Sequence, residues 1–274
     1  MNRIIQLDIA KAICIILVVI GHYVPSNSPA WYVMLHDIIY TFHMPLFMFA
    51  SGYIYMATKK DISYNSFIVK KFKRLMIPYF ASSLIIISIK IFSQRSLSVD
   101  NPVTSLSFFK MFYLPEAGYF LWFIWALWWI FIIVPLIKTP KMRSLFFLFC
   151  LIVTFIPFSL PEEFCLNQCK KMIVFFMFGV FINENKYLNK IITQTNFHQT
   201  LITSLFFIAA EIYFLSFSPI YDNKLIYKAI SFILPYLGIL FIIEISKLIC
   251  KYNTMDKNNL ILKISASSYI IYLT

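Results

Sequence analysis

The sequence predicts an all-α protein, a polytopic transmembrane helix bundle with about eight complete spans and a truncated ninth. Sixty per cent of the 274 residues are apolar, 13% are charged, and the mean hydropathy is +0.77, which excludes an ordinary soluble domain. Apolar runs repeatedly reach the roughly 20 residues that cross a hydrocarbon core of about 30 Å. Because a lipid-exposed backbone must satisfy its own hydrogen bonds, we expect each run to be a helix.

The apolar runs between charged breaks define the predicted helices, which we assign to one membrane domain, residues 1–274. The first run is too long and too polar for a removable signal peptide. The sixth is short unless it begins near Phe164, and a ninth helix begins near Ile264. Since the sequence stops inside this last apolar run, we expect a chain that is cut short there. The eight complete runs cover residues 4–24, 31–57, 75–93, 118–137, 144–160, 172–182, 200–217 and 225–246.

The distribution of Lys and Arg predicts the orientation of these helices. With the N-terminus inside, the inner segments carry sixteen Lys and Arg residues and the outer segments six. Cytoplasmic loops are enriched in these residues, so we expect the N-terminus in the cytoplasm. The same bias explains the net charge of +12, and no nucleic-acid partner is expected.

The first helix carries three polar residues, Asp8, Lys11 and His22, inside an apolar run. Ionisable groups in hydrocarbon are costly, so they usually mark a pathway or a site. Ten residues separate Lys11 from His22, which is roughly 16 Å along a helix, and eleven steps bring the two to within about 20° of each other. This stripe indicates a polar passage, although Asp8 and Lys11 can also simply neutralise each other.

The second helix returns from the same outer side with His36, Asp37, Tyr40 and His43. His36 and His43 are two turns apart on one face, with Tyr40 between them. Histidine titrates near neutrality, so a cluster of imidazole, carboxylate and phenol can take a proton from an alcohol. The alternative for His36 and Tyr40 is an interfacial position at the lipid headgroups.

Two further segments carry candidate binding residues. Lys71 and Arg74 lie in a basic cluster. The cluster is either a phosphate clamp or a result of the enrichment of Lys and Arg on the cytoplasmic side of the membrane. Trp122 lies in an aromatic run that is either a platform for a sugar ring or an interfacial belt. Cys165 and Cys169 share one loop and are either a disulfide or two thiols; no metal site is predicted.

These segments resemble the integral membrane acyltransferase 3 family of bacterial O-acyltransferases. Lys11, ten residues and His22 are similar to the family's first-helix signature, in which Arg or Lys precedes His by that interval; Arg3 lies in the same segment. Residues 41–53 resemble the branch of sugar and exopolysaccharide O-acetylases, and residues 71–78 match a basic pair before a helical proline. Leu121-Trp122-Phe123 resembles a mid-chain Trp-Phe element, with Phe120 where a histidine often stands, and residues 265–274 resemble a late Ser-rich helix.

The resemblance implies transfer of an acetyl group from cytoplasmic acetyl-CoA to a hydroxyl of a cell-surface or lipid-linked glycan, in a bacterial inner membrane. We expect His22 to be the general base or a transient acyl carrier, and His43 to assist it. Lys11, Lys71 and Arg74 are expected to hold acetyl-CoA, and Asp37 and Trp122 the acceptor.

Two other classes of function remain open at this stage. The same buried polar residues would suit a glycan or lipid transporter or flippase without covalent chemistry. A signalling or assembly subunit is the third class. Release of CoA from acetyl-CoA distinguishes the first reading from the other two.

Overall fold

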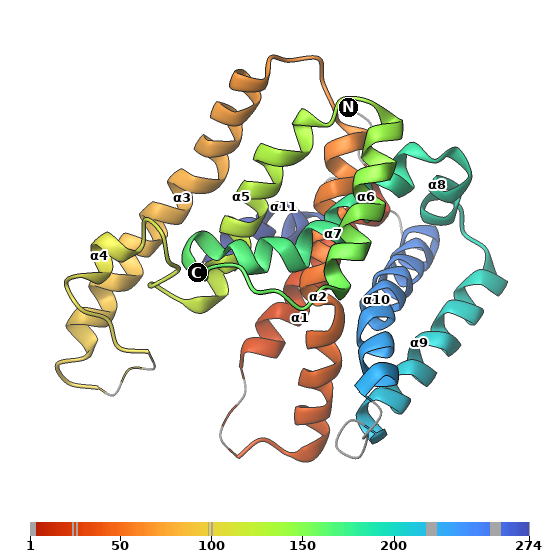
Figure 1. The fold of residues 1–274 in the computed structure, drawn as a ribbon. Helices are drawn as coiled ribbons and strands as arrows, with labels where there is room; N and C mark the ends of the chain where they lie inside the picture. The colour runs from red at the N-terminus through yellow and green to blue at the C-terminus, as the bar shows by residue number, and fades with distance from the viewer. Residues whose placement is uncertain are drawn as a thin grey trace. The chain divides into compact units, whose positions relative to one another are not determined.

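The computed structural model describes residues 4–23, 25, 27–97, 99, 101–217, 224–252 and 259–273, and the elements in this part are all helical (Figure 1). The predicted all-α class is therefore confirmed. The α-helices are α1 (Ile5–His22), α2 (Ala30–Ala57), α3 (Tyr64–Ser93), α4 (Ser107–Lys110), α5 (Trp122–Ile133), α6 (Pro140–Phe155), α7 (Leu166–Glu184), α8 (Lys186–Thr193), α9 (Phe197–Phe217), α10 (Lys224–Tyr252) and α11 (Leu260–Leu273). Three short 3-10 helices are η1 (Tyr119–Leu121), η2 (Val134–Leu136) and η3 (Glu163–Cys165).

Seven helical segments in the described part are long and apolar enough to cross a membrane, one fewer than the eight complete spans predicted. The difference lies in the predicted run 144–160, where α6 ends at Phe155 and has only 16 residues. Sixteen residues reach about 24 Å, which is short of a core of about 30 Å. The short predicted run 172–182 begins earlier, as its length required, because the apolar segment extends over Glu163–Glu184.

Local capping explains where two of the helices begin. Helix α3 begins eleven residues before the predicted position because Ser63 accepts a hydrogen bond from the Ser66 amide. Helix α6 begins after Thr139, which caps the Met142 amide, and has Pro140 in its first turn. The basic residues that interrupt the apolar run therefore lie within α3 and not in a loop before it.

The chain divides into two compact units. The first comprises Met1–Ala57 and Ile182–Tyr272, and the second comprises Thr58–Phe181 with Leu273–Thr274. In the first unit α2 packs against both α1 and α10, and α10 also packs against α1, α8 and α9. Gly238 of α10 permits this packing, because a Cβ there would lie 2.6 Å from Cγ of Phe42 on α2.

Aromatic rings meet at several contacts between the helices of the second unit. Helix α3 packs against α5, where the rings of Phe67 and Phe131 meet at 6.0 Å. Phe131 also meets Phe176 of α7 at 5.5 Å. Helix α6 joins α7 through Phe147, whose ring lies 5.2 Å from that of Phe181.

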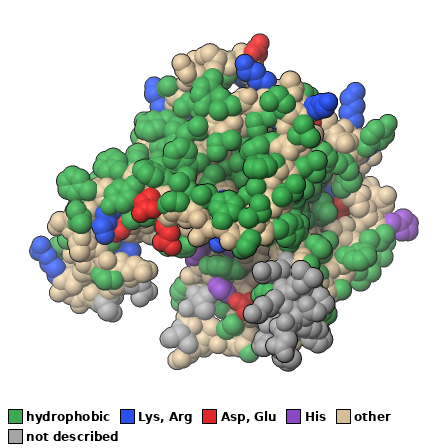
Figure 2. Space-filling view, in the orientation of Figure 1, with side chains coloured by type: hydrophobic (Ala, Val, Ile, Leu, Met, Phe, Trp, Pro, Cys, Tyr) green, Lys and Arg blue, Asp and Glu red, His purple; other side chains and the backbone are tan. Residues whose placement is uncertain are grey.

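The surface fits a membrane environment. Hydrophobic side chains cover most of the face seen in Figure 2, and the Lys and Arg side chains lie mostly toward its margins. Large apolar residues remain exposed along the long helices, such as Ile85 on α3 and Phe206 on α9. Apolar side chains on the outside of long helices are the arrangement expected where lipid, not water, is the solvent.

Candidate active site

The His22 end of α1 is fixed against α2 by a hydroxyl and a glycine. The Tyr32 hydroxyl lies 2.7 Å from the carbonyl oxygen of Ile20 and 2.5 Å from that of Tyr23, so it supplies a donor to the last turn of α1. A Cβ on Gly21 would lie 3.1 Å from the ring of Tyr40, which explains the small residue beside His22. These contacts position His22 next to α2.

Tyr40 is the centre of an aromatic group that we call the histidine cluster, formed by His22, His36, Tyr40 and His43. The Tyr40 ring centroid lies 4.2 Å from that of His36, 4.8 Å from that of His43 and 6.0 Å from that of His22. Tyr40 Oη is also 3.3 Å from His22 Nδ1. The spacing of residues 36, 40 and 43 on one helical face brings their rings together, as the sequence predicts.

His43 is the buried member of the cluster, with 3% of its surface exposed. Its Nδ1 lies 2.8 Å from the carbonyl oxygen of Ile39, so Nδ1–H donates to the backbone and the lone pair is on Nε2. The backbone oxygen of His43 in turn accepts a hydrogen bond from the Cys14 thiol at 3.0 Å. His43 is thus rigidly held, and only its Nε2 can exchange a proton.

Asp37 pairs with His36 and not with His22 among the contacts of the described residues. Asp37 Oδ1 lies 3.0 Å from His36 Nδ1, and both side chains are partly exposed. A carboxylate at this distance can orient the imidazole ring through the contact at Nδ1. The predicted acceptor residue Asp37 is therefore connected to the cluster through His36.

A cavity of about 620 Å³ adjoins the histidine cluster within the first unit. Its polar wall comes from α2, with His36, Asp37, Tyr40 and Thr41, and the opposite wall comes from α9 and α10 and includes Phe214 and Leu234. A polar edge facing an aromatic and aliphatic wall matches a sugar ring, which has hydroxyls at its rim and C–H groups on its face. The cavity therefore offers hydrogen-bonding groups on one side and an apolar surface on the other, next to the cluster.

Two prolines each lie four positions after a residue that lines this cavity. Pro45 in α2 and Pro235 in α10 cannot donate to the residue four positions earlier, which is Thr41 in α2 and Ser231 in α10. Thr41 and Ser231 both line the cavity. The carbonyls of these two lining residues therefore cannot accept the usual N–H bond from the residue four positions later in the helix.

Glu211 contacts a residue that lines the cavity, a connection that the sequence did not predict. It is buried on α9, with 4% of its surface exposed, and its Oε1 lies 2.7 Å from the Thr41 hydroxyl. Its Oε2 is buried and has no hydrogen-bond partner among the described residues. An acidic residue within an apolar run was the available signal, but its partner is 170 positions away.

Lys11 is paired on its own helix. Its Nζ lies 3.1 Å from Asp8 Oδ1, and the hydroxyl of Ser265 on α11 lies 3.1 Å from the same oxygen. The mutual neutralisation of Asp8 and Lys11 is therefore present in the structure. Arg3, which belongs to the same motif, lies outside the described residues.

Lys71, Arg74 and Trp122 lie in the second unit. The Lys71 ammonium is 3.6 Å from the centroid of the Phe131 ring, a cation–π contact, and Arg74 is exposed. Trp122 begins α5, with its ring 6.1 Å from that of Phe123. Cys165 and Cys169 are both buried free thiols, and no cluster of three potential metal ligands occurs among the residues described.

A family model described as an acyltransferase domain matches residues 4–274 of the chain. Nodulation protein NolL of Sinorhizobium fredii is 38% identical over 82 residues, which cover 28% of this chain and 22% of that protein. Nodulation protein NolL of Mesorhizobium japonicum is 32% identical over 105 residues, which cover 35% of this chain and 28% of that protein. These alignments thus span less than a third of either relative, and no solved structure matches. Because the family model covers nearly the whole chain, the protein belongs to the acyltransferase 3 family, as its motifs predicted.

Proposed function

We propose that the protein transfers an acetyl group from acetyl-CoA to a hydroxyl of a cell-surface or lipid-linked glycan. The observation that carries the proposal is the histidine cluster beside a 620 Å³ cavity, in a chain whose family model spans residues 4–274. The bacterial inner membrane and a cytoplasmic N-terminus are part of the proposal, and the distribution of Lys and Arg supports them.

His22 is the residue that we propose takes the proton. When Nδ1–H of His22 donates to Tyr40 Oη, at 3.3 Å, the lone pair is on Nε2. That nitrogen accepts the proton of the acceptor hydroxyl while the hydroxyl oxygen attacks the acetyl carbonyl. The C–S bond then breaks, and the CoA sulfur leaves with the proton. In the second route, His22 carries the acetyl group transiently before the same hydroxyl receives it.

The acceptor occupies the cavity in this proposal. Asp37 and His36 supply hydrogen-bonding groups to the sugar hydroxyls, and Phe214 supplies an aromatic wall for the apolar face of the ring. Trp122 is retained as a proposed acceptor residue on sequence grounds. His43 keeps Tyr40 in place by its ring contact and is proposed to assist His22.

The donor is proposed to bind at the basic cluster of α3. Lys70, Lys73 and Arg74 are exposed there, and cationic side chains of this kind bind the phosphates of a nucleotide. Lys71 fits less directly because its ammonium already lies over the Phe131 ring. Lys11 is proposed to contact the donor as well, and such a contact must compete with its ion pair to Asp8.

The decisive experiment measures CoA release and labelled glycan in membranes that contain the protein, with radioactive acetyl-CoA as the donor. His22→Ala should reduce transfer by about 10²-fold or more, the size expected for loss of a general base. His198→Ala is the matched control, since His198 is an exposed histidine at the start of α9. Normal transfer by a well-expressed His22→Ala variant would refute the mechanism, and wild-type protein that binds glycan without releasing CoA would favour the transporter.

A second measurement tests the donor site. Lys71→Gln with Arg74→Gln should raise KM for acetyl-CoA more than it lowers kcat, because phosphate contacts hold the donor equally in ground and transition states. The effect should diminish at high salt. Lys141→Gln, at an exposed lysine of α6, is the control. An unchanged KM would mean that the basic cluster only helps to set the orientation of the helices in the membrane and does not bind the donor.

A further inference from the structure

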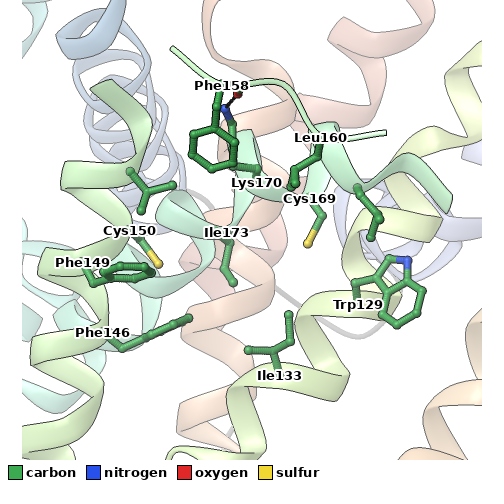
Figure 3. A pocket seen from close by; sticks show the side chains of 12 residues that line it. Trp129, Ile133, Phe146, Phe149, Cys150, Phe158, Leu160, Cys169, Lys170 and Ile173 are labelled. Atoms are coloured by element: carbon green, nitrogen blue, oxygen red, sulfur yellow. Dashed lines mark hydrogen bonds between the residues drawn. The ribbon is translucent and has the colours of Figure 1, made fainter. Parts of the chain in front are cut away.

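A second cavity, of about 330 Å³, lies within the second unit between α5, α6 and α7 (Figure 3). Helix α6 lines it with Phe146, Phe149, Cys150 and Val153, at positions i, i+3, i+4 and i+7 of one face. Helix α7 lines it with the same spacing, at residues 166, 169, 170 and 173. Two helical stripes of the kind that normally pack together thus enclose an open volume in the size range of ligand pockets.

Lys170 is the one charged side chain in this lining. A lysine in an otherwise apolar stripe is costly unless its ammonium reaches polar groups at the edge. Figure 3 shows the Lys170 side chain at one end of the cavity, where its ammonium donates to the carbonyl oxygen of Phe158, and the rings of Phe146 and Phe149 toward the other. The ammonium also lies 4.0 Å from the centroid of the Phe158 ring.

The ammonium of Lys170 retains donors for an anion. It carries three N–H groups, and one of them is directed to Phe158. Among the described residues no carboxylate forms an ion pair with it, whereas Lys11, Lys110 and Lys247 each lie within ion-pairing distance of one. An apolar cavity with one cation at its end is complementary to a hydrocarbon chain that ends in an anionic group.

We infer that this cavity binds one acyl chain of an anionic phospholipid, with the lipid phosphate on Lys170. Charge complementarity selects this occupant, because a zwitterionic headgroup or a neutral chain would leave the ammonium without a net counter-charge. The apolar α6 and α7 stripes contact the chain, and Trp129, held by its Nε1–H bond to the Phe164 carbonyl at 3.0 Å, forms the α5 wall. The site is independent of the proposed transfer reaction.

The test uses the full chain purified in detergent, titrated with phosphatidylglycerol or phosphatidylcholine and read by native mass spectrometry. The wild-type protein should retain one phosphatidylglycerol at concentrations about tenfold below those needed for phosphatidylcholine, the selectivity expected of one charge-assisted hydrogen bond. Lys170→Gln should abolish this preference. Lys171→Gln is the matched control and should keep it, because Lys171 does not line the cavity.

A second pair of variants tests the cavity itself. Val153→Trp places a large side chain in the lining and should reduce retention of both lipids, whereas Ile152→Trp, at the neighbouring position outside the lining and 63% exposed, should not. If Val153→Trp fails to fold, the Lys170→Gln comparison still decides the question. Equal retention of the two lipids by the wild-type protein, the same loss in Lys171→Gln, or displacement of phosphatidylglycerol by an equal concentration of free fatty acid would overturn the inference.

Discussion

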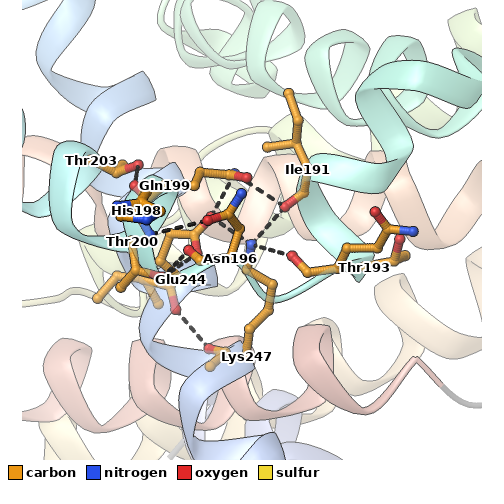
Figure 4. A network of polar contacts seen from close by, with 12 residues as sticks. Ile191, Thr193, Asn196, His198, Gln199, Thr200, Thr203, Glu244 and Lys247 are labelled. Atoms are coloured by element: carbon orange, nitrogen blue, oxygen red, sulfur yellow. Dashed lines mark hydrogen bonds and ion pairs between the residues drawn. The ribbon is translucent and has the colours of Figure 1, made fainter.

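Two buried glutamates of the first unit, Glu244 on α10 and Glu211 on α9, differ in how completely their hydrogen bonds are made. Glu244 Oε1 accepts from Lys247 Nζ at 2.5 Å and from Gln199 at 2.7 Å, and its Oε2 accepts from Thr200 at 2.8 Å (Figure 4). Glu211 accepts from Thr41 alone among the described residues, and its second oxygen is buried without a partner.

The Glu244 network is complete because Lys247 is satisfied as well. Its ammonium donates to the carbonyl oxygens of Ile191 at 2.8 Å and Gln194 at 3.0 Å, so all three of its donors are used. Those carbonyls belong to the end of α8, where a helix leaves acceptors without intrahelical donors. The network therefore joins the α8–α9 connection to α10, which is a structural task.

The surroundings of Glu211 differ from those of Glu244 because Glu211 contacts a residue of the cavity wall. Its partner Thr41 lines the cavity beside the histidine cluster, and Thr41 also lies 2.7 Å from the carbonyl oxygen of Ile38. One hydroxyl proton cannot serve both acceptors at once, so the Thr41 hydroxyl is shared between Glu211 and the backbone, and Glu211 Oε2 stays without a partner among the described residues. The comparison indicates that a complete buried network marks structure, while an incomplete one next to a cavity marks a place where a substrate group or a proton can enter.

The largest expected effect is a loss of stability when the Glu244–Lys247 network is broken. Glu244→Gln should lower the free energy of unfolding by about 3–5 kcal/mol, because it leaves the fully buried Lys247 ammonium without a carboxylate. Combining it with Lys247→Met should recover much of the loss, since the uncompensated charge is removed. Unfolding titrations in detergent micelles measure both variants. If the double variant is no more stable than Glu244→Gln alone, the unpaired Lys247 charge is not the cause of the lost stability.

The contrast between these sites also shows what the sequence can predict. The helices follow from apolar runs, and the grouping of His36, Tyr40 and His43 follows from their spacing along α2, so both could be anticipated. The partnership of Glu211 with Thr41, or of Glu244 with Gln199, joins positions on different helices, and one sequence contains no period that links them. Helix α8 was missed for another reason, because it has eight residues and is amphipathic and not apolar.

The start of α3 and the different environments of Lys71 and Arg74 illustrate a further limit of prediction from sequence. The apolar pattern places the helix start after Arg74, whereas the cap at Ser63 decides the actual start. The contact of Lys71 with Phe131 depends on α5 packing beside α3, which no local pattern records. Local chemistry is therefore predictable where it depends on spacing within one element, and not where a neighbouring element supplies the partner.

The next effect concerns the close packing of α10 against α2. Gly238→Ala should lower the free energy of unfolding by about 1–3 kcal/mol, because the new methyl group would lie 2.6 Å from Phe42 Cγ and closer still to Phe42 Cβ. Gly21→Ala should cost less, since its nearest neighbour is the edge of the Tyr40 ring at 3.1 Å. Equal stability of the Gly238→Ala variant and the wild-type protein in thermal melts would show that α10 does not need this approach to α2.

A smaller effect is expected from Tyr40→Phe. It keeps the ring contacts of the histidine cluster and removes only the hydroxyl next to His22 Nδ1. Acetyl transfer should fall by up to about tenfold, the range of one neutral hydrogen bond, with thermal stability unchanged. Tyr187→Phe is the control, because Tyr187 is 82% exposed on α8. A loss of stability that parallels the loss of activity would instead assign Tyr40 to packing alone.

The smallest effect should come from Glu211→Gln. Because Glu244→Gln is the same substitution at the other buried glutamate, the two variants can be compared directly. The amide oxygen of a glutamine at position 211 can still accept from the Thr41 hydroxyl, as Glu211 Oε1 does, so the cost should stay under about 1 kcal/mol and transfer within a few-fold of wild type. Glu211→Ala should be worse in both respects, since it leaves a void and removes the partner of Thr41. Unfolding titrations and transfer assays on Glu211→Gln, Glu211→Ala and Glu244→Gln rank the three variants by stability and by activity. If Glu211→Gln proves as damaging as Glu244→Gln, then Glu211 is ionised and paired, and the two glutamates differ in location and not in chemistry.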